Sequence, residues 1–290
     1  MSNCQIITAL PKLPQRAPDS HKGTYGKVLV VAGSRGMSGA AVLCGSAALR
    51  GGAGLVQVAT PADVQPIVAA GNPCYTTACL PIELKQHGLA EDAAPIILEL
   101  SESANVLAIG PGMGHSNKVT AVIELLLVQV ERPIVLDADG LNALAKLPSD
   151  VFKRRSAPTI LTPHPGEFAH LVNLSVQEVQ SQRQDLALRF VQDRGIVLVL
   201  KGHGTIVTDG QRLYRNTTGN PGMAAGGTGD VLTGLIAALI AQGLAPFEAA
   251  QLGVYLHGKA GDLAAEDKGQ ISLVATDIID FLPEAFRHAL

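Results

Sequence analysis

The sequence has 290 residues, a formal net charge of −3 and 47% hydrophobic residues. This length and apolar content suffice for one large α/β domain with a sizeable core. The slight negative charge, the 3% of aromatic residues and the absence of tryptophan argue against a nucleic-acid partner, which needs a basic surface and stacking platforms.

Neither cysteine spacing nor hydropathy points to an oxidising or membrane environment. The sequence contains four cysteines, none in a CxxC pair, at positions 4, 44, 74 and 79, which favours reduced thiols over a metal or disulfide framework. The first twenty residues lack the apolar stretch of a signal peptide. The best apolar run, 231–247, is broken by glycine and proline and falls short of the ~20 residues that a bilayer span needs. We expect a cytoplasmic protein with no membrane partner.

The chain begins with a proline-containing stretch and then alternates strand-like and helix-like segments. Residues 1–26 hold three prolines and predict an N-terminal arm outside the core. The expected strands are 27–33, 54–60, 74–80, 105–110, 132–138, 157–163 and 196–202. The expected helices are 38–52 with Ser38 as N-cap, 118–130, 176–195, 229–243, 246–266 and 275–290. Residues 205–216 predict a hairpin that turns at Asp209-Gly210.

This alternation predicts a mostly parallel sheet between two layers of helices, formed by one domain over 27–290. In such folds, ligands bind beyond the carboxyl ends of the strands. Two glycine-rich loops follow strand ends, GSRGMSG (33–39) and GPGMG (110–114). The first has neither GxGxxG nor GxxxxGK[ST] spacing, so dinucleotide-fold and P-loop motifs are excluded. Each loop is either a tight turn or the wall of a substrate pocket.

A third glycine-rich stretch, AAGGTGD (224–230), precedes an apolar helix. Gly226 and Gly227 are free to adopt positive φ. The N–H groups of residues 227–230 would then converge at the positive end of the helix, where four N–H groups lack helical partners. Such a mouth is an anion hole.

Asp230 stands beside this anion hole, where a carboxylate would repel a static phosphate. The residue is explained if a phosphoryl group is transferred there and Asp230 accepts the proton of the attacking hydroxyl, a role that contributes roughly 10²–10⁴-fold. The alternative is a helix cap, for which Asp is well suited.

Several long motifs, in a fixed order over about residues 20–285, resemble the NAD(P)H-hydrate dehydratase family of ribokinase-like enzymes. They are HKGTYGKVLVVAGSRGMSGAA (21–41), VLDADGLNAL (135–144), ILTPHPGEFAHL (160–171), VLKGHGTIV (199–207) and NPGMAAGGTGDVLTG (220–234). The resemblance implies a three-layer α/β/α ribokinase-like fold and a repair lyase. Hydrated NADH or NADPH would be returned to NAD(P)H with consumption of ADP or, in other members, ATP. The ring hydroxyl would be phosphorylated and then lost as phosphate, because phosphate leaves more readily than hydroxide.

The resemblance also implies roles for individual positions. Asp230 would be the base toward the ring hydroxyl, and the transferred phosphoryl would be held by Gly226, Gly227, Thr228 and Gly229, the last also touching the nucleotide. The adenine nucleotide would be bound by Lys201, Gly202, His203, Gly204 and Thr205. The hydrated dinucleotide would be lined by Ala41, Gly112 and His164. Two positions depart from the family pattern, His203 and His115, and put fine nucleotide contacts in doubt.

Other polar residues keep two interpretations. Lys201 neutralises nucleotide phosphates or is an exposed strand-end lysine, and His164 binds substrate or is a solvated turn residue. Glu167 holds Mg²⁺ through water, as related kinases do, or is a first-turn acid favoured by the helix dipole. Asp139 follows Asp137 at a strand end and is expected to cap the next helix, with a place in the substrate pocket as the alternative. His257 is expected to be a packed helix residue rather than a catalyst. Mg²⁺ is expected because phosphoryl transfer needs a divalent ion.

Two rival functions remain at this stage. One is an ATP-dependent small-molecule kinase of the same fold, acting on hydroxyethylthiazole, pyridoxal or hydroxymethylpyrimidine; the other is a non-catalytic nucleotide-binding protein. The preference for ADP or ATP, and for the NADH or NADPH form, stays open. Relatives suggest a homotetramer. Some members carry an epimerase domain ahead of this one, and we expect none here.

Overall fold

The computed structural model describes residues 4–83 and 88–289. In the described residues a ten-stranded sheet runs in the order β1-β12-β11-β10-β9-β8-β7-β2-β3-β4. The strands are β1 (Gln5–Ile6), β2 (Lys27–Val31), β3 (Leu55–Pro61), β4 (Thr76–Leu80), β7 (Val106–Ile109), β8 (Ile134–Leu136), β9 (Thr159–Leu161), β10 (Ile196–Leu200), β11 (Ile206–Thr208) and β12 (Arg212–Arg215), with a separate pair β5 (Ile82–Glu83) and β6 (Gly88–Leu89). From β4 to β10 every neighbouring pair is parallel, whereas β11 is antiparallel to both of its neighbours.

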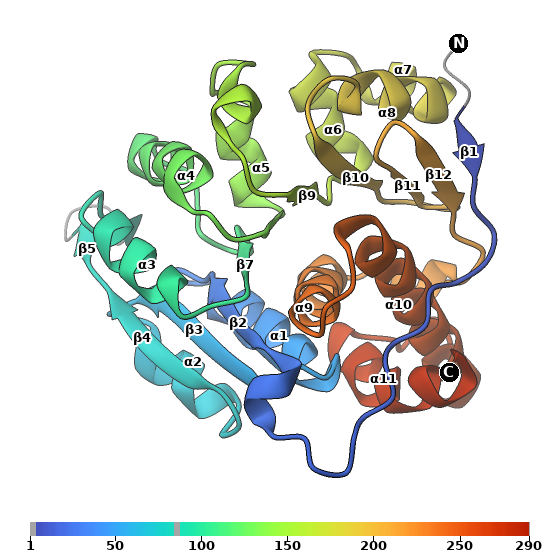
Figure 1. Ribbon diagram of the computed structural model, residues 1–290, viewed down its shortest axis with the longest axis horizontal. Helices are drawn as coiled ribbons and strands as arrows, with labels where there is room; N and C mark the ends of the chain where they lie inside the picture. The colour runs from blue at the N-terminus through green and yellow to red at the C-terminus, as the bar shows by residue number, and fades with distance from the viewer. Residues whose placement is uncertain (1–3, 84–87, 290) are drawn as a thin grey trace.

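Helices cover both faces of the sheet (Figure 1). On one side lie α3 (Ala93–Glu102), α4 (Asn117–Gln129), α5 (Asp139–Leu144), α6 (Pro165–Val172), α7 (Val176–Ser181) and α8 (Arg183–Val191). On the other lie α1 (Ser38–Arg50), α2 (Gln65–Gly71), α9 (Thr228–Ala241), α10 (Pro246–Lys268) and α11 (Ala275–Ala289). Short 3-10 turns are η1 (Lys22–Tyr25), η2 (Val151–Arg154) and η3 (Pro221–Met223). The expected three-layer α/β/α fold is confirmed, and no helix among the described residues is long and apolar enough to span a bilayer.

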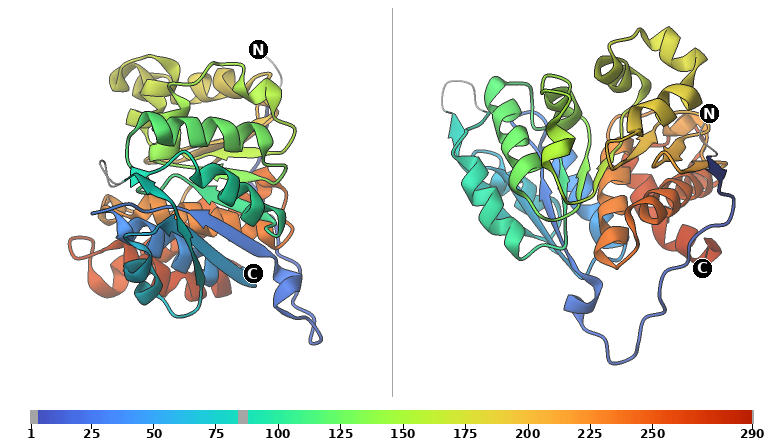
Figure 2. Two further views of the ribbon diagram at one scale, coloured as in Figure 1. Left: turned by 90° about the vertical axis from the view of Figure 1, so that its left-hand side faces the viewer. Right: turned by 45° about the horizontal axis from the view of Figure 1, so that its top comes forward.

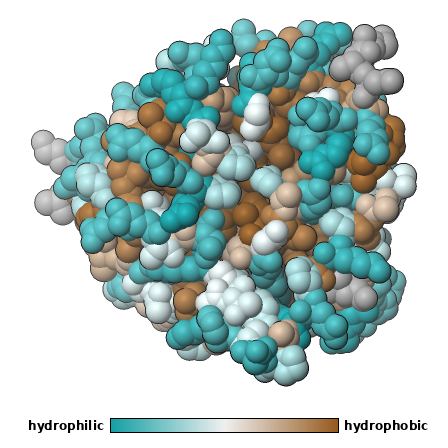
Figure 3. All heavy atoms as spheres, viewed as in Figure 1, coloured by the Kyte–Doolittle hydropathy of each residue, from teal (hydrophilic) through white to brown (hydrophobic). Residues whose placement is uncertain are grey.

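The central strands are buried because both faces of the sheet are covered. All residues of β7 and β10 are buried, which explains their continuous apolar runs of Val, Ile and Leu. Two apolar clusters result, one against α1, α9, α10 and α11 and the other against α3 to α8. The surface facing the viewer in Figure 3 is mainly hydrophilic, with apolar atoms visible toward its centre.

Helices α1 and α9 pack closely because a glycine of α9 lies against the backbone of α1. A β-carbon added at Gly234 of α9 would overlap the carbonyl oxygen of Cys44 on α1. Glycine at this position lets the two backbones approach. Because α9 starts at Thr228, this contact also sets where the mouth of α9 lies relative to the sheet.

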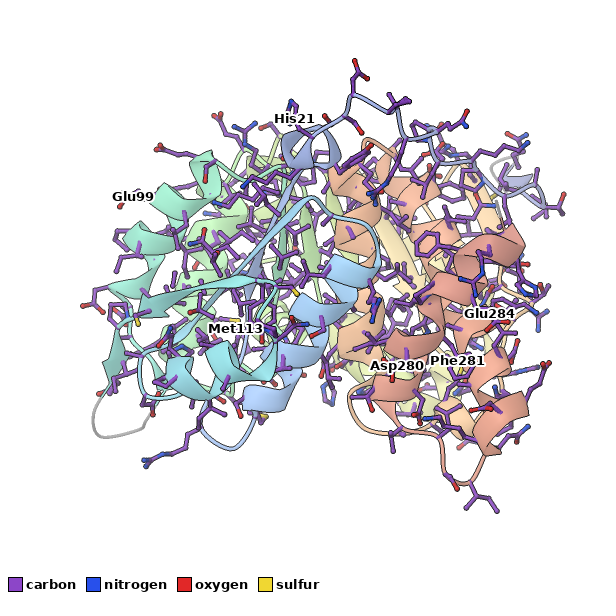
Figure 4. All side chains as sticks on the ribbon, turned by 90° about the horizontal axis from the view of Figure 1, so that it is seen from below. His21, Glu99, Met113, Asp280, Phe281 and Glu284 are labelled. Atoms are coloured by element: carbon purple, nitrogen blue, oxygen red, sulfur yellow. The ribbon has the colours of Figure 1, made fainter. Side chains whose placement is uncertain are left out.

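Residues 4–26 form an extended arm, as predicted, but they also add a strand to the sheet. β1 pairs in parallel with β12, and the arm then crosses α10 and α11 before turning into β2 (Figures 1 and 2). Nε2 of Gln251 donates to the carbonyl of Ala9 at 2.8 Å. Figure 4 shows His21 at the turn into β2 and Asp280, Phe281 and Glu284 on α11. The expectation that the arm stands outside the core therefore needs correction, because it closes one sheet edge.

Two local predictions are wrong. The N-cap position of α1 is Met37, without a side-chain hydrogen bond, and Ser38 is the first helical residue. The single helix expected over 176–195 is two helices, α7 and α8, separated at Gln182 with φ −134°. No glycine or proline marks this break, and it places Arg183 where its side chain contacts the β10 loop.

Candidate active site

The loops that follow the parallel strands meet in front of α9. Nζ of Lys201, after β10, lies 2.8 Å from Oδ1 of Asp137, after β8. The Gly114 N–H, from the loop after β7, donates to Oδ2 of Asp139 at 2.7 Å. A β-carbon at Gly229 would lie 3.2 Å from Nζ of Lys201. Loops far apart in the sequence therefore converge on the first turn of α9, as expected for this fold.

The mouth of α9 has the open backbone that the glycine stretch predicts. Gly227 has φ 88°, and a β-carbon there would lie 2.5 Å from Cδ1 of Leu43. Among the described residues, none of the N–H groups of 226–230 donates to a protein atom. Of the two glycines free to adopt positive φ, Gly227 does so and Gly226 does not; a β-carbon added at Gly226 would meet open space. One left-handed residue suffices to turn the chain into the helix.

Asp230, in the first turn of α9, is partly buried. Within the described residues its carboxylate accepts no hydrogen bond from another side chain or from the backbone. Burial, followed by the neighbouring charge of Asp137, raises the pKa of Asp230 to about 7, although the charge of Lys201 opposes both. The alternative role as a helix cap is not observed, because the N-cap position belongs to Gly227. Asp230 is thus a carboxylate without a structural partner beside free amides.

Lys201 is a half-buried cation rather than an exposed strand-end lysine. Its side chain is 18% exposed and that of Asp137 is 1% exposed. Burial lowers the pKa of Lys201, but the charges of Asp137 and Glu167 outweigh it, so the net shift is upward. Oγ1 of Thr233 on α9 donates to Oδ2 of Asp137 at 2.7 Å. Thr233 thus holds Asp137, and Asp137 in turn holds the ammonium of Lys201 beside the anion hole.

His164 and Glu167 form a reciprocal cap on α6. Nδ1 of His164 accepts from the N–H groups of Gly166 and Glu167, and Oε2 of Glu167 accepts from the His164 N–H at 2.8 Å. The first-turn reading of Glu167 is therefore confirmed. Burial raises the pKa of Glu167 to about 7, partly offset by Lys201, whose Nζ is 4.0 Å away. Nε2 of His164 lies 3.4 Å from Oε1 of Glu167, and the histidine side chain is 58% exposed. His164 is therefore the N-cap of α6 and not a simple solvated turn residue.

A cavity of about 600 Å³ opens beside the anion hole. One wall is the whole loop 201–205, and the opposite wall comes from 216–224 and from α10. Arg183 holds the loop from behind, because its guanidinium donates to the carbonyls of Leu200, Lys201 and His203. With its carbonyls engaged on that side, the loop turns toward the cavity. Thr228 and Gly229 line the end of the cavity, so cavity and anion hole are continuous.

The residues expected to line the dinucleotide site lie on the other side of the mouth. Gly112 has φ 63°, and a β-carbon there would contact Met37 and Ala40 at 2.9–3.0 Å, so the loops 33–39 and 110–114 pack together. Gly112 is itself buried, and Ala41 is fully buried in α1. Their roles in substrate binding stay predictions.

Sequence reasoning missed how Asp137 and Asp139 act. Asp139 does not cap α5, whose N-cap position is Ala138 with φ 49°; it instead binds the Gly114 N–H and Nε2 of His115, the latter at 3.1 Å. Asp137 had no assigned role, although its place at the end of a buried strand was a usable signal. Nothing in the sequence indicated that Arg183 contacts the site, because Arg183 follows a helix break that was not predicted.

No metal cage is formed by the described part of the chain, where no three His, Cys, Asp or Glu side chains gather as metal ligands. Glu167 and Asp137 nevertheless offer carboxylate oxygens, the donors that Mg²⁺ prefers.

Comparison with known proteins gives consistent matches over nearly the whole chain. Residues 28–284 match the NAD(P)H-hydrate dehydratase family. A bifunctional NAD(P)H-hydrate repair enzyme from Moorella thermoacetica is 45% identical over 99% of this chain and 54% of its own length. The ADP-dependent (S)-NAD(P)H-hydrate dehydratase of Bacillus subtilis is 36% identical over 95% of this chain and 94% of its own length. The chain spans about half the length of the bifunctional relatives it matches.

Solved structures agree with this assignment. The ADP/ATP-dependent NAD(P)H-hydrate dehydratase from Bacillus subtilis, co-crystallised with ATP and Mg²⁺, superposes with a TM-score of 0.82 at 33% identity, covering 96% of this chain and 95% of that one. A hydroxyethylthiazole kinase from Pyrococcus horikoshii, 15% identical with a TM-score of 0.57, shares the fold. On its sequence matches, this ribokinase-like chain belongs to the NAD(P)H-hydrate dehydratase family.

Proposed function

We propose that this chain dehydrates hydrated NADH or NADPH with consumption of ADP, yielding NAD(P)H, AMP and phosphate. The observation that carries the proposal is the partnerless carboxylate of Asp230 beside the free amides at the mouth of α9. A binding protein gains nothing from a carboxylate at a phosphate site, whereas a phosphoryl transfer to a hydroxyl needs a base there. Family membership and the similar ADP-dependent dehydratase support the same reaction.

Each wall of the site has a part in this proposal. The loop Lys201, Gly202, His203, Gly204 and Thr205 would hold the adenine nucleotide in the 600 Å³ cavity. The transferred phosphoryl would lie on the amides of Gly226, Gly227, Thr228 and Gly229, with Lys201 beside it. The hydrated ring would approach from the side of Ala41, Gly112 and His164. Because Ala41 is fully buried, its contact would require the loop 33–39 to shift.

The reaction balances as two steps. The ring hydroxyl oxygen attacks the β-phosphorus of ADP, the bond from that phosphorus to AMP breaks, and Asp230 takes the hydroxyl proton. The ring carbon–oxygen bond then breaks with loss of phosphate, and loss of a proton from the neighbouring ring carbon restores the double bond. Free amides and Lys201 stabilise the charge on the moving phosphoryl group, the contribution that positioned donors make best.

Magnesium fits the site as an ion carried by the nucleotide. With no three-ligand cluster in the parts described, Glu167 would hold it through water, and its chemistry would be charge neutralisation on the phosphates. The similar dehydratase structure obtained with ATP and Mg²⁺ supports this assignment.

Three wider assignments also belong to the proposal. We expect residues 27–290 to act as one catalytic domain with 1–26 as its arm, the protein to be a homotetramer, and its location to be cytoplasmic. Light scattering on the eluting peak of a size-exclusion column measures the oligomeric state directly.

The decisive assay supplies hydrated NADH with ADP or ATP and follows the nicotinamide absorbance. Recovery of absorbance together with AMP and phosphate in equal amounts is the expected result. Recovery with ATP rather than ADP would reassign the co-substrate. A flat absorbance trace, with phosphate transferred instead to hydroxyethylthiazole, pyridoxal or hydroxymethylpyrimidine, would replace the dehydratase by the kinase alternative. Nucleotide binding with turnover of neither substrate would leave the non-catalytic protein.

A further inference from the structure

Helix α10 holds the wall of the nucleotide cavity that segment 216–224 forms, at two points. Oγ1 of Thr218 donates to the carbonyl of Tyr255 at 2.9 Å, and Nδ2 of Asn220 donates to the carbonyl of Gly261 at 2.9 Å. Between these anchors lies His257, which lines the same cavity. The helix therefore sets the distance between the cavity wall and any group that His257 contacts.

His257 contacts the mouth of α9 through one hydrogen bond. Its Nε2 is 2.9 Å from the carbonyl oxygen of Thr228. Because a carbonyl oxygen only accepts, Nε2 must carry the hydrogen in this contact. Burial lowers the pKa of His257 to about 4, so the ring is neutral at ordinary pH and Nδ1 carries no proton.

The bonded carbonyl shares a peptide unit with the amide of Gly229. The Thr228 carbonyl and the Gly229 N–H lie on opposite sides of one planar trans peptide. Holding the carbonyl toward α10 therefore directs the N–H to the opposite side of this peptide unit, away from His257. Gly229 has no side chain through which its own orientation could be fixed.

We propose that His257 is a positioning residue that orients the Gly229 N–H in the anion hole by donating from Nε2 to the Thr228 carbonyl. The proposal goes beyond a packing role for this histidine and rests on the proposed function only in that the anion hole holds a phosphoryl group. His257 itself makes no bond and moves no proton in the reaction.

The test measures binding of orthovanadate, a phosphoryl mimic, by calorimetry in the presence of saturating AMP. His257→Phe keeps a ring but removes the donor, and His257→Gln keeps an amide donor; His288→Phe, on the surface of α11, is the matched control. We expect His257→Phe to weaken vanadate binding at least about tenfold with AMP affinity changed less than about threefold, and His257→Gln to recover most of the loss. Outright loss of a donor costs roughly 10²–10³-fold in kcat.

Two outcomes would overturn the positioning role. One is unchanged vanadate affinity in His257→Phe; the other is an equal loss of AMP and vanadate binding, which indicates collapse of the cavity. Should His257→Phe not fold, His257→Asn, whose amide is too short to reach the carbonyl, gives the same comparison. Since no hydrated dinucleotide is used, a failed dehydratase assay with normal vanadate behaviour would remove the proposed function and leave this inference in place.

Discussion

At the scale of single residues, the site holds more negative than positive side chains. The ammonium of Lys201 faces Asp137 at 2.8 Å and Glu167 at 4.0 Å, and Asp230 and Asp139 also contribute to the local field. Burial is the largest cause, and one cation does not offset burial and the neighbouring carboxylates together, so the pKa of Asp230 and that of Glu167 both rise to about 7. A carboxylate with such a pKa is a stronger base than an ordinary one, which suits proton abstraction near neutral pH.

Replacing Asp230 separates catalysis from binding. Asp230→Asn keeps the shape of the side chain but cannot accept the hydroxyl proton, so we expect kcat to fall at least about 100-fold. Nucleotide affinity should stay within about threefold, because Asp230 does not line the nucleotide cavity. Steady-state kinetics and calorimetric titration with ADP measure the two effects. Undiminished turnover would remove Asp230 from the role of base.

The raised pKa of Asp230 also predicts how pH acts. The base must be ionised, so kcat/KM should rise with pH and level off above about 7. The folded protein binds more protons than the unfolded chain between the ordinary value of 3.8 and about 7. Raising the pH through this window therefore lowers the free energy of unfolding. In thermal melts from pH 4.5 to 7.5, Asp230→Asn should lose less stability than the unchanged protein; parallel curves would contradict the shift.

The place of a residue could be predicted where it belongs to a sequence motif. It could not be predicted where contacts between distant segments decide it. The loop 201–205 lines one cavity with Thr228 and Gly229, and Asp230 lies in the same first turn of α9; the roles of these residues stay predictions. The clamp by Arg183 and the hydrogen bond from the Gly114 N–H to Asp139 join segments 17 to 25 positions apart. No local pattern encodes such a pairing, so the sequence predicted a cap or a substrate-pocket role for Asp139 but not its bond to the Gly114 N–H.

At the scale of elements, the geometry of the anion hole depends on how the chain turns into α9 and how α9 packs on α1. Gly227 turns the chain at φ 88° with the side chain of Leu43 beneath it, and Gly234, two turns later, lies against the backbone of α1. Both contacts exclude a side chain. Position and orientation of the free amides therefore follow from two glycines that never touch a ligand through a side chain.

Gly227 and Gly226 should respond differently to the same change. Gly227→Ala forces a β-carbon into the left-handed region and to 2.5 Å from Cδ1 of Leu43, so we expect a loss of stability of about 1–3 kcal/mol. Gly226→Ala, with open space around it, should unfold within about 0.5 kcal/mol of the unchanged protein. Urea unfolding compares the pair, and equal losses would show that the turn geometry is not the cause.

The packing of α1 on α9 can be tested in the same way. Gly234→Ala would overlap the carbonyl oxygen of Cys44, a backbone atom that cannot rotate aside, and we expect a loss of about 1–3 kcal/mol together with reduced kcat. Gly39→Ala, in α1 with no atom within 4 Å of the added carbon, should be neutral or stabilise by up to about 1 kcal/mol. Calorimetric unfolding decides, and an equally stable Gly234→Ala would refute the close contact.

Most elements were predictable because period and composition agree with burial. β10 and α9 lie within two residues of the expected bounds. The break between α7 and α8 was not, because Gln182 and Arg183 are ordinary helix formers and the break is held by the bonds of Arg183 to the β10 loop. Strand β1 was missed because two residues are too few to show a period.

At the scale of the whole molecule, the arm connects one edge of the sheet to the interior strand β2. It lies on β12 through β1, crosses α10 and α11, and enters the sheet again as β2 (Figure 2). Without β1, β12 would present an open edge, a common site of unwanted pairing. The arm therefore protects the sheet as well as covering apolar side chains of the core.

Two neighbouring arm residues test this role. Leu10 packs against the core while Lys12 is exposed. Leu10→Ser should lower the free energy of unfolding by about 1–2 kcal/mol through loss of partial apolar burial, and Lys12→Ser should change it by less than about 0.5 kcal/mol. Differential scanning calorimetry compares the two. Indistinguishable melting temperatures would mean that the arm adds no stability to the domain.

The meeting of Asp137, Lys201 and Gly229 at one edge of the sheet bears on how activity arises during folding. These groups lie 64 and 28 positions apart along the chain, and the strands that carry Asp137 and Lys201 have β9 between them. Non-local pairings of this kind form late. Activity should consequently return only after all of the parallel strands have paired. Recovery of turnover should therefore mark the last kinetic phase of renaturation.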